Sequence, residues 1–303
     1  MIAPTPSPAV AAPRAVLAAA PHRDAPPPAG RGWVEVNELC GRSRATRLRA
    51  HQPLRLLAPR SFERAACLCV SSFGGGLVAG DHLHLDVTLG RASRCLVTTQ
   101  ASTKVYRPTA AHAGASQIMH AHVADDALLV AWPDPITCYA HAIYEQRQRI
   151  ELAPHASALI VDCLTSGRRA HGEHWAFDRY ISRNELVVAG RTRALDTLRL
   201  DRADGPLDAP FRMGGHACYA SVLAAGPLLA GLIETVRRHA HAAVPTPDAA
   251  TIAGVSDIDT DGDLPALTLR AVAHDTTTMQ TFLRQCLADV APLLGDAPWH
   301  RKW

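Results

Sequence analysis

Hydrophobic and polar residues alternate in short runs over the first two thirds of the chain, which is the period of a half-buried β-strand. The clearest run lies within Ser71–Pro108, where residues 83, 85, 87 and 89 are apolar and His82, His84 and Asp86 alternate with them. Further strands are expected at 32–57 (two strands with a turn near Gly41), 117–123, 127–132, 143–152, 158–164, 175–188 and, after a hairpin at Gly190, 192–200. A spacing of roughly 8–12 residues between short strands predicts a mainly β fold.

The pattern changes after Pro210. Residues 217–243 have helical composition, with a kink or a break expected at Gly226–Pro227. Residues 251–273 resemble a hairpin across Asp261–Gly262, and 277–294 place apolar residues on one face of a single helix. The sequence therefore predicts a layered β body of many short strands, with about two to three helices between residues 210 and 303.

The N-terminal segment differs from the rest of the chain in composition. Residues 1–31 are rich in alanine and contain eight prolines, so they cannot bury enough surface to offset the entropy of ordering. We expect residues 1–31 to be a disordered leader and residues 32–303 to form a single β-rich domain.

Composition narrows the class of protein further. Hydrophobic residues make up 48% of the chain, and the formal net charge of +3 is too small to indicate a nucleic-acid-binding surface. The 8 cysteines are scattered through apolar runs, which is typical of reduced thiols rather than a disulfide scaffold. Because the sequence also lacks a convincing signal peptide and a long apolar segment, we expect a cytoplasmic protein.

Several catalytic and metal-binding motifs are only partly present. Gly75–Gly80 has the spacing of a phosphate loop, but Asp81 follows where such a loop needs lysine. His171–His174 has a three-residue spacing instead of the four of a zinc-protease helix. A calcium loop beginning at Asp257 would need glutamate at its twelfth position, which is Thr268. No complete catalytic set is found, and we expect a protein that is not an enzyme.

One strand carries a candidate metal site. His82, His84 and Asp86 lie on the same face because side chains two residues apart in a strand point the same way. They leave open the alternative of a metal-dependent hydrolase, and His120 and His122 repeat the spacing on another strand. The simpler interpretation is a solvated strand face without metal, as in a β-rich binding module.

Four blocks of sequence, in order, resemble the urease accessory protein UreD family, also called UreH. The blocks are GGGLVAGD at 74–81, TTQASTKVYR at 98–107, Pro133–Pro135, and 164–173. The motif residues to which we assign a structural role are Gly74, Gly75, Gly76, Gly80, Thr103, Lys104, Gly167 and Arg168. The resemblance extends with least ambiguity over residues 32–200. It departs from the family pattern at Phe73, where proline is usual, and at Trp132, which is shifted by one position.

The resemblance implies a β-helix-like body that acts as a non-catalytic scaffold. Members of this family bind UreF and, through it, the GTPase UreG, and they dock on the urease apoprotein to help deliver nickel to its active site. An internal tunnel has been proposed as the nickel route. Transient nickel, with no tightly bound cofactor, is the implied cargo. Candidate residues for the route are the carboxylates Asp81, Asp134, Asp162 and Glu173, because oxygen ligands hold nickel more loosely than imidazole does.

Overall fold

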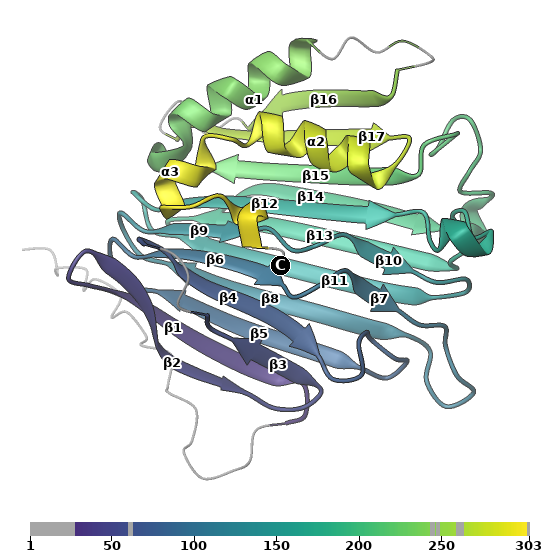
Figure 1. Ribbon diagram of the computed structural model, residues 1–303, viewed down its shortest axis with the longest axis horizontal. Helices are drawn as coiled ribbons and strands as arrows, with labels where there is room; N and C mark the ends of the chain where they lie inside the picture. Colours follow the sequence, from purple (N-terminus) through teal and green to yellow (C-terminus); the bar gives the residue numbers. More distant parts are fainter. Residues whose placement is uncertain (1–27, 60–62, 243–245, 247–248, 259–263, 302–303) are drawn as a thin grey trace, which may run out of the picture.

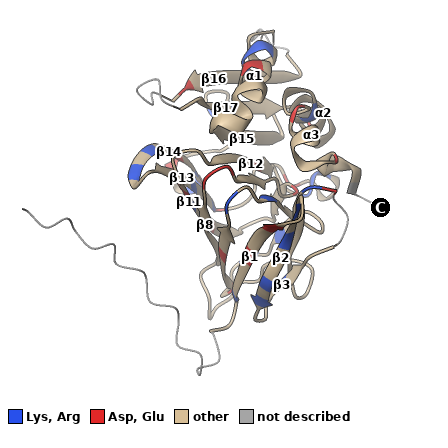
Figure 2. Ribbon diagram, turned by 90° about the vertical axis from the view of Figure 1, so that its left-hand side faces the viewer, with Lys and Arg blue, Asp and Glu red and all other residues tan. Residues whose placement is uncertain are grey.

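Two stacked β-sheets and three α-helices make up the computed structural model, which describes residues 28–59, 63–242, 246, 249–258 and 264–301. The two sheets lie face to face, and the helices cover the outside of one of them (Figures 1 and 2). We refer to the seven-stranded sheet as sheet A and to the ten-stranded sheet as sheet B. The mainly β prediction, with helices confined to the C-terminal third, is confirmed.

Sheet A is parallel in its centre and closed at each edge by an antiparallel hairpin. Its strands, in spatial order, are β14 (Arg191–Asp201), β13 (Arg179–Val188), β11 (Ile143–Leu152), β8 (Ala115–Val123), β5 (His82–Leu89), β1 (Arg31–Leu39) and β2 (Arg42–Ala50). The predicted turns near Gly41 and Gly190 form the two edge hairpins, and both glycines have positive φ angles.

Sheet B combines four parallel strands with antiparallel strands on both sides. In spatial order it contains β16 (Thr251–Asp257), β17 (Ala266–Ala273), β15 (Cys218–Ala225), β12 (Ser157–Thr165), β9 (Leu128–Ala131), β6 (Arg94–Thr99), β4 (Ala66–Ser72) and β3 (Leu54–Leu57). Two short strands, β7 (Thr103–Val105) and β10 (Ile136–Cys138), pair with each other and extend this sheet beside β12.

From β4 to β13 the chain passes back and forth between the sheets, and each round trip adds one long strand to each sheet. Successive strands within a sheet are therefore parallel, as in a two-sided β-helix. This coiling is the helix-of-strands arrangement that the family resemblance implies. It explains why strands recur at short, regular intervals in the sequence, since each half-turn of the coil uses one strand and one turn.

The two sheets bury their side chains differently, and this explains the two sequence patterns. Sheet A packs only its inner face, so residues 83, 85, 87 and 89 are buried while His82, His84 and Asp86 point outward. Sheet B is covered on one face by sheet A and on the other by the helices, so every residue of β9 and nearly every residue of β12 is buried. A sheet covered on both faces gives continuous apolar runs rather than alternation.

The C-terminal prediction was wrong in two places. Residues 218–225, expected to begin a helix, form β15, and the helical segment is α1 (Ala230–Ala242). The expected single helix at 277–294 is two helices, α2 (Thr276–Cys286) and α3 (Val290–Leu294). A continuous helix would need Pro292 to donate a backbone hydrogen bond, which proline cannot do. Proline is tolerated in the first turn of a new helix, because backbone N–H groups there have no partner within the helix.

The helices pack on sheet B and complete a second core. Their buried residues include Leu232, Ile233, Val236, Met279 and Leu283. The apolar faces of the helices are therefore used inside the protein. Short 3₁₀ turns η1 (Arg169–His171), η2 (Arg202–Asp204), η3 (Pro227–Leu229) and η4 (Pro298–Arg301) connect the elements.

Three other expectations have different outcomes. None of the eight cysteines forms a disulfide in the described part of the chain, and most are buried. No helix among the described residues is long and apolar enough to cross a membrane. The expected disordered leader falls mainly on residues 1–27, which lie outside the described residues. The expected hairpin turn at Asp261–Gly262 and most of the partial calcium motif also lie outside them.

Candidate functional site

The four sequence blocks meet at one end of the two sheets, which we call the motif end. Strand β7 lies in the second block and pairs with β10, which follows the third block at Pro133–Pro135. Strand β10 in turn pairs with the end of β12, where Leu164 and Thr165 begin the fourth block. The glycine block joins through a bridge between Leu77 and Val105. Segments that are far apart in the sequence are therefore joined by strand pairing at this end.

The glycines of the first block have steric roles. Gly74 and Gly75 have φ angles of 90° and 76°, a conformation that favours glycine. A Cβ atom on Gly76 would lie 2.7 Å from the carbonyl oxygen of Lys104, so only glycine allows this approach. The side chain of Lys104 is exposed, and its backbone supplies the contact.

Asp81, one of the candidate nickel-route residues, closes the turn that leads into β5. Its carboxylate accepts a hydrogen bond of 2.9 Å from the backbone N–H of Val78. Gly80 beside it has a φ angle of 93°. The structure thus gives Asp81 a turn-forming role at the edge of the motif end.

Glu173 and Arg168 form an ion pair at the motif end. Arg168 donates from its Nε atom to Glu173 Oε2 at 3.0 Å, and from its Nη2 atom to Oε1. The guanidinium lies over the ring of Tyr139, 4.0 Å from its centroid. The hydrogen bonds from Arg168 hold the pKa of Glu173 below its ordinary value. The carboxylate is therefore ionised at neutral pH although only 9% of the residue is exposed.

Asp134 follows β9 and is 6% exposed. Its Oδ2 atom accepts a hydrogen bond of 3.2 Å from the hydroxyl of Thr99, and its backbone N–H donates to the same hydroxyl at 2.7 Å. A cavity of about 260 Å³ opens nearby, next to Pro135. Among the residues that line it are Ser102, Thr137, Thr165 and Ser166, together with the charged residues Arg169 and Asp275. The motif end therefore combines two acidic side chains with a cavity lined partly by serine and threonine.

Asp162 lies between the sheets. It projects from β12 of sheet B and is 3% exposed. Three side chains of sheet A donate hydrogen bonds to it: Gln148 at 2.8 Å, Ser182 at 2.9 Å and Asn184 at 2.7 Å. Gln146 extends the network by donating to Ser182 at 2.9 Å. Burial raises the pKa of Asp162, although the hydrogen bonds partly oppose this effect. The interior therefore contains a polar layer centred on one carboxylate.

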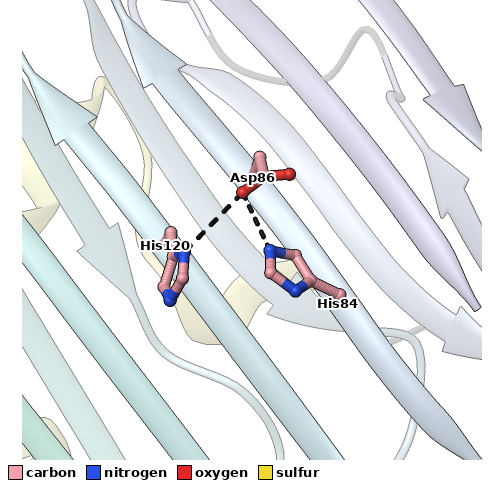
Figure 3. Close-up of side chains that lie close together, drawn as sticks. All are labelled: His84, Asp86 and His120. Carbon is pink, nitrogen blue, oxygen red and sulfur yellow. Dashed lines mark hydrogen bonds and ion pairs between the residues drawn. The ribbon is translucent and has the colours of Figure 1, made fainter. Parts of the chain in front are cut away.

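Figure 3 shows a separate group on the outer face of sheet A, formed by His84, Asp86 and His120. Nε2 of His84 lies 2.9 Å from Oδ1 of Asp86, and Nδ1 of His120 lies 3.9 Å from the same oxygen. His82, which the sequence grouped with His84 and Asp86, instead forms a hydrogen bond of 2.8 Å with Ser116. The metal-competent group in the structure thus contains His120 in place of His82.

Comparison with known proteins identifies the family. The model of the UreD urease accessory protein family matches residues 29–303. The chain belongs to the UreD family. It is 42% identical over 277 residues to a urease accessory protein UreD of Sorangium cellulosum, an alignment that covers 91% of this chain and 85% of the relative.

Other members of the UreD family have similar coverage. A urease accessory protein UreD of Anaeromyxobacter is 40% identical over 273 residues, covering 90% of this chain and 89% of the relative. Urease accessory protein D of Arabidopsis thaliana is 32% identical over 296 residues, covering 88% and 99%. These relatives are named as accessory proteins, so this UreD-family chain is a urease accessory protein and not an enzyme. The hydrolase alternative receives no support from them.

Sequence reasoning named the UreD candidate residues but not the side chains that contact them. Thr99 and Arg168 lay inside the recognised blocks, but nothing in the sequence paired them with Asp134 and Glu173. The donors to Asp162 come from β11 and β13 of the other sheet. Their polar side chains, at alternating positions on the inner faces of β11 and β13, are the signal that could have found them.

Proposed function

We propose that this chain helps deliver nickel to the urease active site, as a non-catalytic cytoplasmic scaffold. In this proposal it binds UreF and, through it, the GTPase UreG, and it docks on the urease apoprotein. The observation that carries the proposal is the convergence of four distant sequence blocks on one end of the sheets, around the ionised side chain of Glu173. An accessory protein without catalytic residues needs such a surface for docking and transfer.

The chemistry of the carboxylates supports transient handling of nickel. Oxygen donors bind nickel more weakly than imidazole or thiolate does. Glu173, Asp134 and Asp162 also have protein donors already, so an entering cation must compete with Arg168, Thr99 or the amides around Asp162. Competition of this kind favours short residence, which suits a carrier more than a storage site.

Exposed apolar side chains support protein docking at the same end. Phe73 is 59% exposed and Val78 is 52% exposed, and they flank the glycine turn. Large apolar residues exposed close together are typical of an interaction surface. We place the docking of a maturation partner at this end of the molecule.

The test uses co-expression of the urease subunits with all accessory proteins at limiting nickel. Replacing Glu173 with Gln, or Asp134 with Asn, keeps side-chain size but removes the charge. We expect nickel per urease active site to fall by about tenfold, the lower end of the loss seen when groups that support a metal site are removed. Asp126→Asn is the matched control, since Asp126 is an exposed carboxylate that is also paired with an arginine, Arg91, but lies between β8 and β9 at the opposite end of the sheets.

Two further readouts make the result specific. The variants must remain folded, as judged by their thermal unfolding, and must co-purify with the other accessory proteins as the unchanged chain does. Loss of nickel with binding intact supports transfer through these carboxylates. Nickel content equal to that of the Asp126→Asn control would contradict it.

A further inference from the structure

The outer face of sheet A presents two imidazoles and a carboxylate that the proposed nickel route does not use. His84 and Asp86 are two residues apart on β5, and His120 is the register partner of Asp86 on the neighbouring strand β8. This face is opposite the one that contacts the Asp162 network, because the inner residues of β5 and β8 belong to the core between the sheets. Two adjacent strands therefore hold the three side chains on a rigid frame.

The donor atoms are close to the spacing of a coordination shell. One ligand atom from each of His84, Asp86 and His120 lies within 4.8 Å of the other two. Metal–ligand bonds of about 2.0–2.2 Å place neighbouring donor atoms about 3–3.5 Å apart. Small side-chain rotations would bring the donor atoms of His84, Asp86 and His120 to this spacing. The rings of His84 and His120 are already edge to face, with centroids 4.9 Å apart.

The charges around the group leave it available to a cation. Arg31 contacts the other carboxylate oxygen of Asp86, Oδ2, at 3.4 Å, and leaves Oδ1 facing the imidazoles. Arg149, the other nearby cation, is paired with Glu151 and Glu185 at 2.8 Å each. The side chains of His84, Asp86 and His120 are between 26% and 43% exposed, so an ion can reach them from solvent.

We propose that His84, Asp86 and His120 bind one divalent transition-metal ion of the class that includes Ni²⁺, Zn²⁺, Co²⁺ and Cu²⁺. Two imidazoles with a single carboxylate suit these ions, whereas Mg²⁺ and Ca²⁺ prefer sets of oxygen ligands. Binding through His84 Nε2 uses the neutral tautomer of the imidazole that carries its proton on Nδ1. Water completes the coordination, so the site remains open to exchange. This inference goes beyond the delivery function and does not require it.

The experiment is a calorimetric titration of the untagged, purified full-length chain with Zn²⁺ and, separately, Ni²⁺. His84→Ala, Asp86→Asn and His120→Ala should each remove one bound ion per chain, or weaken it by more than about tenfold. His122→Ala and His82→Ala are the matched controls, because these histidines lie on the same two strands and the same face but interact with Glu151 and Ser116 instead. Both controls should bind as the unchanged chain does.

Two results would overturn the proposal. One is the same number and affinity of bound ions in all three ligand variants as in the unchanged chain. The other is equal weakening by the two controls, which would mean diffuse binding by a histidine-rich face. X-ray absorption at the metal edge gives a second check, since two imidazoles should be seen in the unchanged chain and one in His120→Ala. Urease is absent throughout, so the outcome is separate from that of the delivery experiment.

Discussion

Asp162 is the residue whose environment differs most from that of an ordinary surface carboxylate. It lies between the sheets and receives hydrogen bonds from uncharged amide and hydroxyl groups. Burial raises its pKa because the charged form loses the solvation of water. The folded protein therefore binds the Asp162 proton more tightly than the unfolded chain does, and this difference makes a prediction about stability.

Above about pH 4, the unfolded chain has released the Asp162 proton while the folded protein still holds it, so folding stability falls as the pH rises toward the folded pKa. The variant Asp162→Asn lacks this titration. We expect the free energy of unfolding of the original chain, relative to the variant, to decrease with rising pH and then level off. The total decrease is about 1.4 kcal/mol for each unit by which the pKa is raised.

Urea unfolding of both proteins from about pH 4 to 8 measures this difference. Comparing slopes rather than absolute stabilities removes any constant cost of fitting an amide at this position. A difference that does not depend on pH, or that grows as the pH rises, would contradict a raised pKa at Asp162.

The burial of single residues was easier to predict than their contacts. The sequence indicated four buried polar candidates, Asp81, Asp134, Asp162 and Glu173. The last three are buried, whereas Asp81 is partly exposed. The sequence grouped His82 with His84 and Asp86 because the three share one strand. In the structure, His82 instead forms a hydrogen bond with Ser116 on β8. The register between β5 and β8 places His120 beside Asp86, and register depends on the coiling of the whole chain, which local alternation does not reveal.

At the scale of elements, the strand and helix patterns were informative where one face is exposed. Strands β5 and β8 alternate clearly because they belong to the one-sided sheet A. Strand β15 lies between β12 and β17, and all eight of its residues are buried. Its run of alanine, leucine and valine therefore has no alternation and was mistaken for helix.

The turn that contains Gly76 gives a prediction at this scale. Replacing Gly76 with Ala would force a Cβ atom to within 2.7 Å of both the Lys104 carbonyl oxygen and the Tyr106 ring. The Lys104 carbonyl oxygen belongs to the backbone and cannot rotate away as a flexible side chain could. We therefore expect a loss of about 1–3 kcal/mol in the free energy of unfolding. Gly215→Ala is the control, since its Cβ would meet nothing within 4 Å and its φ angle is not positive.

Denaturant unfolding of the two variants measures the comparison. The Gly215→Ala protein should unfold close to the midpoint of the original chain, and the Gly76→Ala protein well below it. Equal midpoints for the two variants would show that the close approach between the first and second sequence blocks adds little to stability.

For the whole molecule, the layered arrangement explains how distant sequence blocks come together. The chain coils between two sheets, and the turns at one end of the coil collect the four blocks. The same coiling leaves the outer face of sheet A open, and the helices cover only sheet B. Resemblance to a family indicated the function class from sequence, whereas the shared location of the blocks required the structure.

The central claim is that the chain is needed to load urease with nickel. The most direct measurement is the nickel content per urease active site, at limiting nickel, in cells that express the urease subunits and the other accessory proteins with and without this chain. We expect urease to accumulate equally in both cases but to remain poor in nickel without the chain. Equal nickel content and activity in the two cases would contradict the claim.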